Sequence, residues 1–473
     1  MTNESSTPLG LCSSCCLAAA LILLMGCGEP AEEIGPHSEL ENVLLITLDT
    51  TRADHLGCYG HNQDTSPVLD ALAAEGVRFE MAQSTSALTP MSHASILTGL
   101  FPQRHGLRVF YGPTGNSLRD DLPTLASWLQ EHGWSTAAFV SAYTASQRYG
   151  LDRGIETFDS GLDQTLDELD LTRQQQHEHS WHDGRQTNTQ RRGDATTDAA
   201  LAWLEHAAEP FMLWVHYFDP HDSSLVPPKE FLDPYEIAPG EGAKARIAIY
   251  DPEIRYMDLQ IGRLLERLRD RGQLESTIVV VMADHGQGLL QHDWMRHRLI
   301  YQEGVRIPLI LRIPGEIRGT VVESLVRNVD VFPTVLDYLD IEAPDGLDGS
   351  SLRTLIQGDT ESEPRIGYAE ALNTLDTHSP GSLPRRQKDL LFSIVEKDWK
   401  LIYHQEHPKN SELYHLATDP EELHNVIEQH PEEAKRLMAR LRASGGLEIE
   451  VIHREGREDP EMMDKLRSLG YIQ

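Results

Sequence analysis

The segment NVLLITLDTTRADHLGCYG, residues 42–60, decides the fold class of this chain. Its apolar run from Val43 to Leu48 ends in Asp49. A short continuous apolar run is typical of a strand buried in a parallel sheet, and α/β proteins place their sites at the carboxyl ends of such strands. Asp49 is therefore a candidate metal ligand, although an Asp after a strand is more often a cap or turn residue.

A second segment repeats this pattern far along the chain. In TIVVVMADHGQG, residues 277–288, an apolar run ends in Asp284 and His285. Carboxylates and an imidazole at the ends of two such strands strengthen the metal-ligand interpretation of Asp49, because neighbouring parallel strands end at one edge of a sheet.

Length and composition limit the possible classes of protein. The 473 residues exceed one typical domain, although α/β folds of this size often share one core. With 74 acidic and 41 basic residues the net charge is −33, which argues against nucleic acid or anionic lipid as a partner recognised by charge. Four of five cysteines lie in the first 27 residues, so Cys58 is alone in the body and no internal disulfide framework is expected there.

The N-terminal segment is interpreted as a targeting sequence. The apolar run Leu17 to Met25 is too short to span a bilayer and fits the core of a signal peptide. Its end, LMGC, resembles a bacterial lipobox in which Cys27 is acylated, although the preceding MTNESSTPLG lacks Lys and Arg. We expect an exported bacterial lipoprotein at a periplasmic or outer-membrane surface, tethered through Cys27. Plain secretion and a retained anchor stay open.

The remaining chain alternates between strand-like and helix-like patches, which indicates a mostly parallel sheet between helices. His216 falls in the strand candidate 211–216 and is interpreted as a packed side chain. The pattern of apolar and polar residues changes near residue 390, where a hairpin of two strands and then a helix are expected. The predicted organisation is a signal segment at 1–27, a linker at 28–40, a main domain at 41–385 with an inserted polar loop at 163–194, and a C-terminal subdomain at 386–473.

A third informative segment is STSALTPMSHASILTGLFPQRHG, residues 84–106. Thr89 precedes Pro90, which is favoured in the first turn of a helix, so a helix is expected to start here. Its N-terminus would favour an anion and would place the Thr89 hydroxyl as a candidate nucleophile toward an anionic ester. The alternative is that Thr89 only caps the helix, which needs the same geometry.

Together these three segments resemble the signature regions of sulfatases, within the alkaline phosphatase superfamily. The resemblance runs from about residue 42 to the end, interrupted near 163–194, and includes PFMLWVHYFDPHD (210–222) and YQEGVRIPLILRIPG (301–315). It implies an α/β sandwich, with a large mostly parallel sheet between helices and a smaller C-terminal α+β subdomain. It also implies a divalent metal at the carboxyl edge of the sheet and the hydrolysis of sulfate or phosphate esters.

The resemblance implies roles for individual residues. Asp49, Asp284, His285 and Thr89 stand at metal-binding positions, and Thr89 also stands at the nucleophile position. One divalent ion, Ca²⁺, Mn²⁺ or Zn²⁺, is expected.

Further residues stand at positions that face the substrate in the family. His221 matches a His that holds the oxygens of the ester, and His297 falls where many sulfatases place a Lys, with Arg298 as the alternative. His292 matches a His near the substrate. For Arg52 two roles stay open, a clamp on an oxyanion or an ion pair with a nearby acid.

The departures from the family pattern bear on the chemistry. Sulfatases typically carry C-x-P-x-R or S-x-P-x-R, whereas here Thr89 replaces the Cys and His93, still counted as a substrate contact, replaces the Arg. Thr50 replaces a second Asp, and FVSAYTAS (139–146) lacks the expected Lys-x-His. Thr89 is a secondary alcohol, so no formylglycine is expected and Thr89 would form an ordinary covalent ester. The changed ligand set favours Mn²⁺ or Zn²⁺ over Ca²⁺.

The sequence therefore predicts a metal-dependent hydrolase that cleaves sulfate or phosphate esters of small molecules, glycans or lipids through Thr89. Thr nucleophiles with such ligands also resemble phosphodiesterases and lipoteichoic acid synthases, so a phosphodiesterase or phospho-group transferase is the first alternative. The second is a non-catalytic binding lipoprotein on a sulfatase fold. Retention of Asp49, Asp284, His285 and His221 opposes it.

Overall fold

The structure is a computed structural model that describes residues 40–111, 115–162, 185–221, 225–236, 243–375, 389–449 and 460–469. The predicted lipidation site Cys27, the predicted linker up to residue 39 and most of the predicted loop 163–194 lie outside these residues. Within the described residues, no helix combines the length and the apolar character that crossing a membrane requires.

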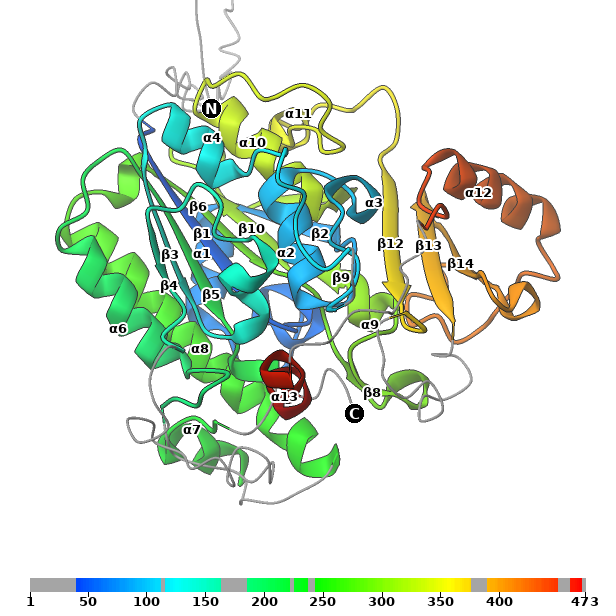
Figure 1. The fold of residues 1–473 in the computed structure, drawn as a ribbon, viewed down its shortest axis with the longest axis horizontal. Helices are drawn as coiled ribbons and strands as arrows, with labels where there is room; N and C mark the ends of the chain where they lie inside the picture. The colour runs from blue at the N-terminus through cyan, green and yellow to red at the C-terminus, as the bar shows by residue number, and fades with distance from the viewer. Residues whose placement is uncertain are drawn as a thin grey trace, which may run out of the picture. The chain divides into compact units, whose positions relative to one another are not determined.

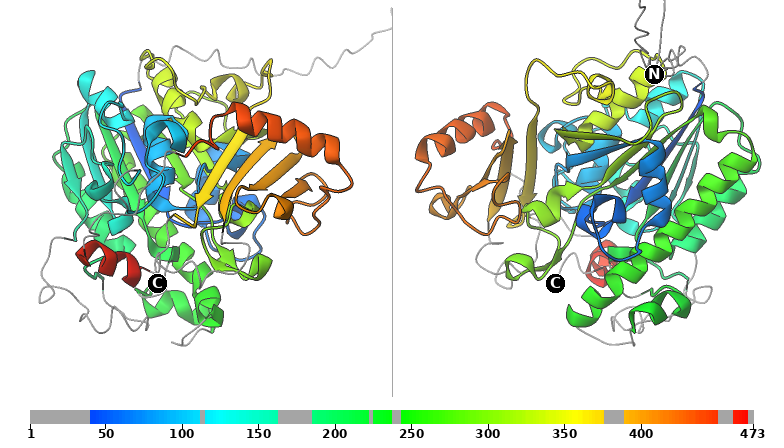
Figure 2. Two further views of the ribbon diagram at one scale, coloured as in Figure 1. Left: turned by 45° about the vertical axis from the view of Figure 1, so that its right-hand side comes forward. Right: turned by 180° about the vertical axis from the view of Figure 1, so that it is seen from behind.

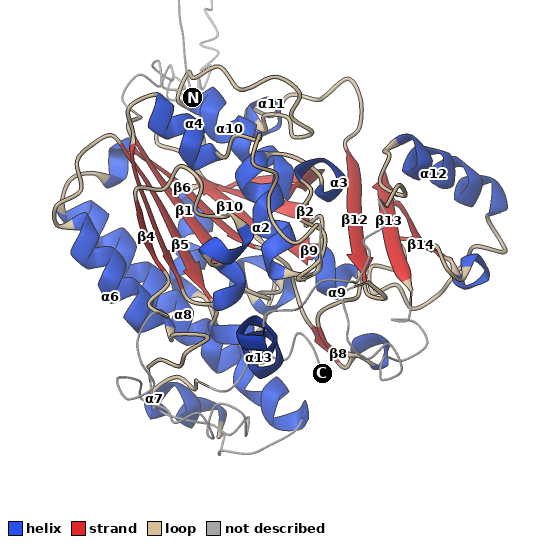
Figure 3. Cartoon of the chain, viewed as in Figure 1, coloured by secondary structure: helices blue, strands red, loops and turns tan. Residues whose placement is uncertain are grey.

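A nine-stranded sheet forms the centre of the fold, and its middle strand β1 (Asn42–Leu48) is the first apolar run of the sequence (Figures 1 and 3). Strands β5 (Phe211–Tyr217) and β6 (Thr277–Ala283) flank β1 and run parallel to it. Leu48 pairs with Tyr217 on one side and with Ala283 on the other. This register makes all three strands end at the same level, so the residues that follow them meet at one edge of the sheet.

The outer strands make the sheet mixed, although most pairs are parallel. Strand order is β11-β2-β10-β6-β1-β5-β3-β4, with β9 paired to β2. Only β10 and β9 run antiparallel to their neighbours in this sheet. Pro308, which has no amide hydrogen to donate, separates β9 from β10. The outer strands are β2 (Val77–Gln83), β3 (Ser135–Val140), β4 (Thr157–Asp159), β9 (Arg306–Ile307), β10 (Leu309–Arg312) and β11 (Thr320–Arg327).

Helices cover both faces of the sheet, and Figures 1 and 2 place α2 and α8 on opposite faces. The long helix α8 buries an apolar stripe at helical spacing that includes Ile254, Met257 and Ile261. The helices that pack together with α8 (Ala243–Asp270) are α1 (Pro67–Glu75) and α6 (Gly193–Leu204). The helices that pack against α2 (Thr89–Thr98) are α3 (Pro102–His105), α4 (Leu125–Glu131) and α10 (Val331–Tyr338), and α11 (Arg353–Ile356) packs against α10. Three further short helices are α7 (Lys229–Leu232), α9 (Gln302–Val305) and α13 (Pro460–Ser468). The predicted sandwich is therefore confirmed.

A separate four-stranded antiparallel sheet, drawn in yellow and orange in Figure 1, forms the smaller C-terminal part. It contains the predicted hairpin, β13 (Leu390–Glu396) with β14 (Trp399–His404), and α12 (Pro431–Ala443) packs on it. Its first strand is β12 (Ile366–Leu372) and its last is β15 (Glu412–His415). The small sheet thus begins before residue 386, where the sequence placed the subdomain boundary. A two-stranded hairpin, β7 (Gly288–Leu289) and β8 (Met295–Arg296), lies between β6 and β9 in the chain.

Candidate active site

Thr89 is the first residue of α2, and its hydroxyl points to the ends of β1 and β6. Its Oγ1 atom donates to Oδ2 of Asp49 at 3.2 Å and lies 3.3 Å from Nε2 of His285. The N-cap of α2 is Leu88, which offers no side-chain cap. The alternative that Thr89 serves as the helix cap is therefore wrong, because its side chain contacts the ends of two strands.

Asp49, Asp284 and His285 form a fully buried group in which one ligand atom from each residue lies within 4.8 Å of the others. Oδ1 of Asp284 accepts the backbone N–H groups of Thr50 at 3.1 Å and of His285 at 2.7 Å. Among the described residues, Oδ1 of Asp49 and Oδ2 of Asp284 have no hydrogen-bond partner. Buried carboxylate oxygens without a partner are costly, and a bound cation removes that cost.

The charges of this group also fit a divalent cation. Burial raises the pKa of Asp49 well above its usual range, against a hydrogen bond from Thr89. Burial, and next the charge on Asp49, raise the pKa of Asp284 in the same way. Burial lowers the pKa of His285 to about 3, so its imidazole is neutral. Two carboxylates that repel each other and a neutral imidazole are a ligand set for a divalent transition metal.

Hydrogen bonds from outside the group orient its members. Nδ1 of His285 lies 2.9 Å from the carbonyl oxygen of Gly286, which turns Nε2 toward Thr89. Thr50 has a φ of 52°, a left-handed conformation that is uncommon for a β-branched residue, and it directs the Thr50 N–H at Asp284. Nε2 of His216 lies 3.3 Å from Oδ2 of Asp49.

The contact of His216 with Asp49 is a feature that sequence reasoning missed, since His216 was interpreted only as a packed side chain. The signal for it is the strand register, which pairs His216 with Thr47 of β1, two residues before Asp49. This register is known only once β5 is seen to pair with β1, so the sequence alone does not predict the contact.

Two predicted substrate residues, His221 and His297, lie beside this group. The ring of His221 stacks on Phe218 with centroids 4.1 Å apart, and it lies 5.1 Å from the ring of His297. The ring of His297 lies 5.6 Å from that of His285. Burial lowers the pKa of both His221 and His297, so both are neutral rings, each of which carries one N–H donor.

His93, another predicted substrate residue, is engaged by protein groups at both ring nitrogens. Nδ1 lies 2.8 Å from the carbonyl oxygen of Thr89, and Nε2 lies 3.0 Å from Oγ1 of Thr47. Trp214 donates to the same Thr47 oxygen, which leaves the Thr47 hydroxyl hydrogen for His93. His93 therefore holds the first turn of α2 against β1, and the structure gives no support to a contact with substrate.

His292 and Arg52, also predicted to face the substrate, bind protein groups in the structure as well. Nδ1 of His292 lies 2.7 Å from Glu303 and Nε2 lies 3.0 Å from the carbonyl oxygen of Glu422. Arg52 forms a two-pronged pair with Asp54, at 2.9 Å and 2.6 Å. Of the two roles left open for Arg52, the structure shows the ion pair, and His292 ties the segment after β6 to the C-terminal part.

Comparison with known proteins identifies the class that this fold and site define. The family described as "Sulfatase" matches residues 41–341, and the family described as "N-sulphoglucosamine sulphohydrolase, C-terminal" matches residues 290–444. The chain therefore belongs to the sulfatase family, as its motifs predicted. It is accordingly a sulfuric or phosphoric ester hydrolase by class.

Individual relatives span nearly the whole chain. The chain is 25% identical to an N-acetylglucosamine-6-O-sulfatase of Bacteroides thetaiotaomicron, over 91% of this chain and 90% of that protein. It is 27% identical to an arylsulfatase of Clostridium perfringens, over 88% and 95%. Among solved structures, a phosphonate monoester hydrolase of Agrobacterium radiobacter has a TM-score of 0.68 at 21% identity, covering 85% of this chain and 96% of that one. This last likeness shows the shared fold.

Proposed function

We propose that this protein hydrolyses sulfate or phosphate esters, with the Thr89 hydroxyl as nucleophile and with a divalent metal held by Asp49, Asp284 and His285. The observation that carries the proposal is the position of Thr89 Oγ1, at hydrogen-bond distance from Asp49 and 3.3 Å from His285. A hydroxyl at a helix N-terminus and beside metal-ligating side chains is suited to attack an anionic ester.

The two carboxylate oxygens without a hydrogen-bond partner support the metal assignment. When bound, a divalent ion lowers the pKa of a nearby hydroxyl and offsets negative charge on the transferring group. One imidazole and two carboxylates favour Mn²⁺ or Zn²⁺.

The side chains of the site supply the nucleophile, the proton acceptor and the groups that stabilise charge. In the first step Thr89 Oγ1 bonds to sulfur or phosphorus while the bond to the leaving alcohol oxygen breaks, and one proton moves from Thr89 to that alcohol. Asp49 Oδ2, which already accepts the Thr89 hydroxyl, is the nearest group to take the proton first. Water then attacks the covalent ester and restores the threonine. The amide groups at the start of α2 and the N–H groups of His221 and His297 stabilise the charge that develops.

The substrate class and the location are part of the same proposal. A small-molecule or glycan ester suits the site, since the relative from Bacteroides thetaiotaomicron is named for a sulfated sugar. A lipid tether at Cys27 would hold the enzyme at a periplasmic or outer-membrane surface. Because Thr89 cannot become formylglycine, a phosphodiesterase or phospho-group transferase is the second candidate, and it too would use Thr89.

The test is turnover of nitrophenyl sulfate, nitrophenyl phosphate and bis-nitrophenyl phosphate, each with Ca²⁺, Mn²⁺ or Zn²⁺. We expect metal-dependent turnover of at least one ester. Thr89→Ala should abolish it, whereas Thr89→Ser should retain part of it and permit mass detection of the covalent ester. Thr98→Ala is the matched control, because Thr98 lies in the same helix and its hydroxyl bonds only to nearby backbone groups, the Ala94 carbonyl oxygen and the Leu100 N–H.

Each outcome decides between the candidates. Unchanged turnover in Thr89→Ala would remove Thr89 from the mechanism. Product that forms only when an alcohol acceptor is added would indicate a transferase. No turnover of any ester, with or without acceptor, would favour a binding lipoprotein.

A further inference from the structure

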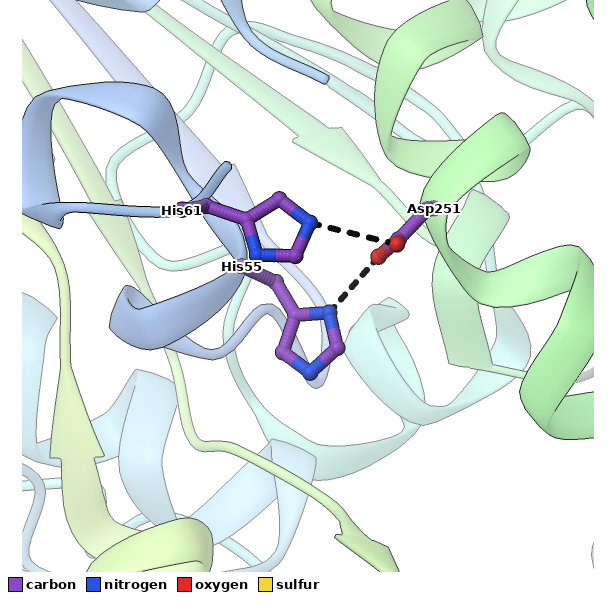
Figure 4. Close-up of side chains that lie close together, drawn as sticks. All are labelled: His55, His61 and Asp251. Atoms are coloured by element: carbon purple, nitrogen blue, oxygen red, sulfur yellow. Dashed lines mark hydrogen bonds and ion pairs between the residues drawn. The ribbon is translucent and has the colours of Figure 1, made fainter. Parts of the chain in front are cut away.

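The side chains of His55, His61 and Asp251 lie close together outside the active site, where the loop that follows β1 meets α8. His55 Nδ1 lies 2.6 Å from one carboxylate oxygen of Asp251, and His61 Nε2 lies 3.2 Å from the other (Figure 4). The rings of His55 and His61 have centroids 5.0 Å apart. The three side chains are 14–20% exposed, so solutes can reach them from the solvent.

The arrangement joins two elements that are far apart in the sequence. His55 ends a short 3₁₀ helix and His61 follows a second one, both in the loop that leads away from Asp49. Asp251 lies in α8. Figure 4 shows the two imidazoles reaching from the loop toward the helix.

The donor set is that of a transition-metal site. Two imidazole nitrogens and a carboxylate oxygen are the ligands that Zn²⁺ and related ions prefer, and three protein ligands leave one position for water. Ligand atoms around one zinc ion lie roughly 3.3 Å apart, from metal–ligand distances of about 2.0–2.1 Å. Here one ligand atom from each residue already lies within 4.8 Å of the others, so small side-chain rotations suffice.

We propose that His55, His61 and Asp251 bind a divalent transition-metal ion, with Zn²⁺ as the best fit, and that this ion fastens the loop 50–61 to α8. The site is distinct from the active-site group, with which it shares no residue. It therefore stands whether or not the proposed nucleophile and catalytic metal are correct.

The neighbouring residue of α8 gives the site a route to the active site. Tyr250 donates its hydroxyl hydrogen to the carbonyl oxygen of Thr50 at 2.6 Å and accepts the N–H of Arg52 at 3.0 Å. Thr50 in turn donates its N–H to Asp284. An ion that holds the loop to α8 thus also holds the backbone that positions Asp284.

The test uses the full chain with the active-site ligands removed, as Asp49→Asn/Asp284→Asn, so that zinc at the second site is measured alone. Equilibrium dialysis with metal analysis and titration calorimetry with Zn²⁺ should show one bound ion per chain. Adding His61→Gln should reduce zinc affinity at least tenfold, and adding His55→Gln should do the same. His407→Gln is the matched control, because His407 pairs with Asp389 in another candidate group.

A second readout guards against misfolded variants. Zn²⁺ should raise the melting temperature of the Asp49→Asn/Asp284→Asn protein, and this shift should be lost in His61→Gln while the melting temperature without metal stays nearly unchanged. Absence of zinc binding in the Asp49→Asn/Asp284→Asn protein would overturn the proposal. So would binding that survives both histidine variants or that is lost in His407→Gln.

Discussion

The Nε2 atom of His216 lies 3.3 Å from Oδ2 of Asp49, the same oxygen that accepts the hydroxyl of Thr89. Nδ1 of His216 faces the backbone N–H of Ser141 at 3.3 Å and accepts from it, so the ring hydrogen is on Nε2 and points at Asp49. Two donors on Oδ2 leave Oδ1 of Asp49 for a cation. His216 is therefore a positioning residue for a proposed metal ligand.

We expect His216→Phe to lower metal affinity and kcat by about 10–100-fold, the usual effect of removing a hydrogen bond to a metal ligand. His216→Gln should recover part of this loss, because its amide nitrogen can still donate to Asp49. Metal titration and steady-state kinetics on both variants measure the difference, with the exposed His206→Gln as control. Equal losses in Phe and Gln variants would indicate a packing role only.

His292 should make the stability of the protein depend on pH. Burial alone lowers its pKa, but the hydrogen bond and charge of Glu303 outweigh burial and raise the pKa above the ordinary value. For a raised histidine pKa, the stabilisation is fully present below the unfolded value of about 6.5 and is lost as pH rises through the folded value. Urea unfolding of the native protein should therefore show a loss of stability above pH about 6.5.

His292→Gln should flatten that part of the stability profile and should leave KM nearly unchanged, because both ring nitrogens bind protein groups. His132→Gln is the control, since His132 is exposed. A large rise in KM without any change in the stability profile would restore the substrate-binding role.

Arg108 and Glu370 form a buried pair that joins the loop after α3 to the small sheet, with two hydrogen bonds of 2.8 Å and 2.7 Å. Arg108→Met should lower the free energy of unfolding by about 3–5 kcal/mol, because it leaves Glu370 buried without its cation. Arg119→Met removes an exposed pair with Asp121 and should have little effect. Chemical denaturation of both variants measures this, and similar midpoints would contradict the prediction.

The backbone of Glu303 approaches Gly286 so closely that only a glycine fits directly after Asp284 and His285. A Cβ atom here would lie 2.2 Å from the carbonyl oxygen of Glu303, which is backbone and cannot move alone. Gly286→Ala should destabilise the protein by about 1–3 kcal/mol and reduce activity by displacing His285.

The control for Gly286→Ala is Gly262→Ala in α8, where a Cβ meets a methyl group of Val68 at 3.0 Å. A helical alanine is favoured by about 0.5–1 kcal/mol, which offsets that contact. Denaturation midpoints that fall equally in both variants would show that close approach to Glu303 is not the cause.

The elements that could be predicted are those whose pattern of apolar residues within one segment is enough to identify a strand or a helix. The apolar runs before Asp49 and Asp284 predicted two strands, and these strands are adjacent at the centre of the sheet. Strands β2 and β11 were missed because their residues are only partly buried and alternate between apolar and polar. Helix α2 begins at Thr89, beside Pro90, as expected from a proline in the first turn of a helix.

By itself the sequence determined the strand ends that bring Asp49, Asp284 and His285 together, and the helix start that holds Thr89. Burial and periodicity along one segment carry that information, because a parallel strand surrounded by apolar neighbours must itself be apolar. Only the tertiary structure decided which polar groups pair. His216 contacts Asp49, His93 and His292 bind protein groups, and His55 meets Asp251, since a hydrogen bond depends on the relative position of elements that the sequence separates by long stretches.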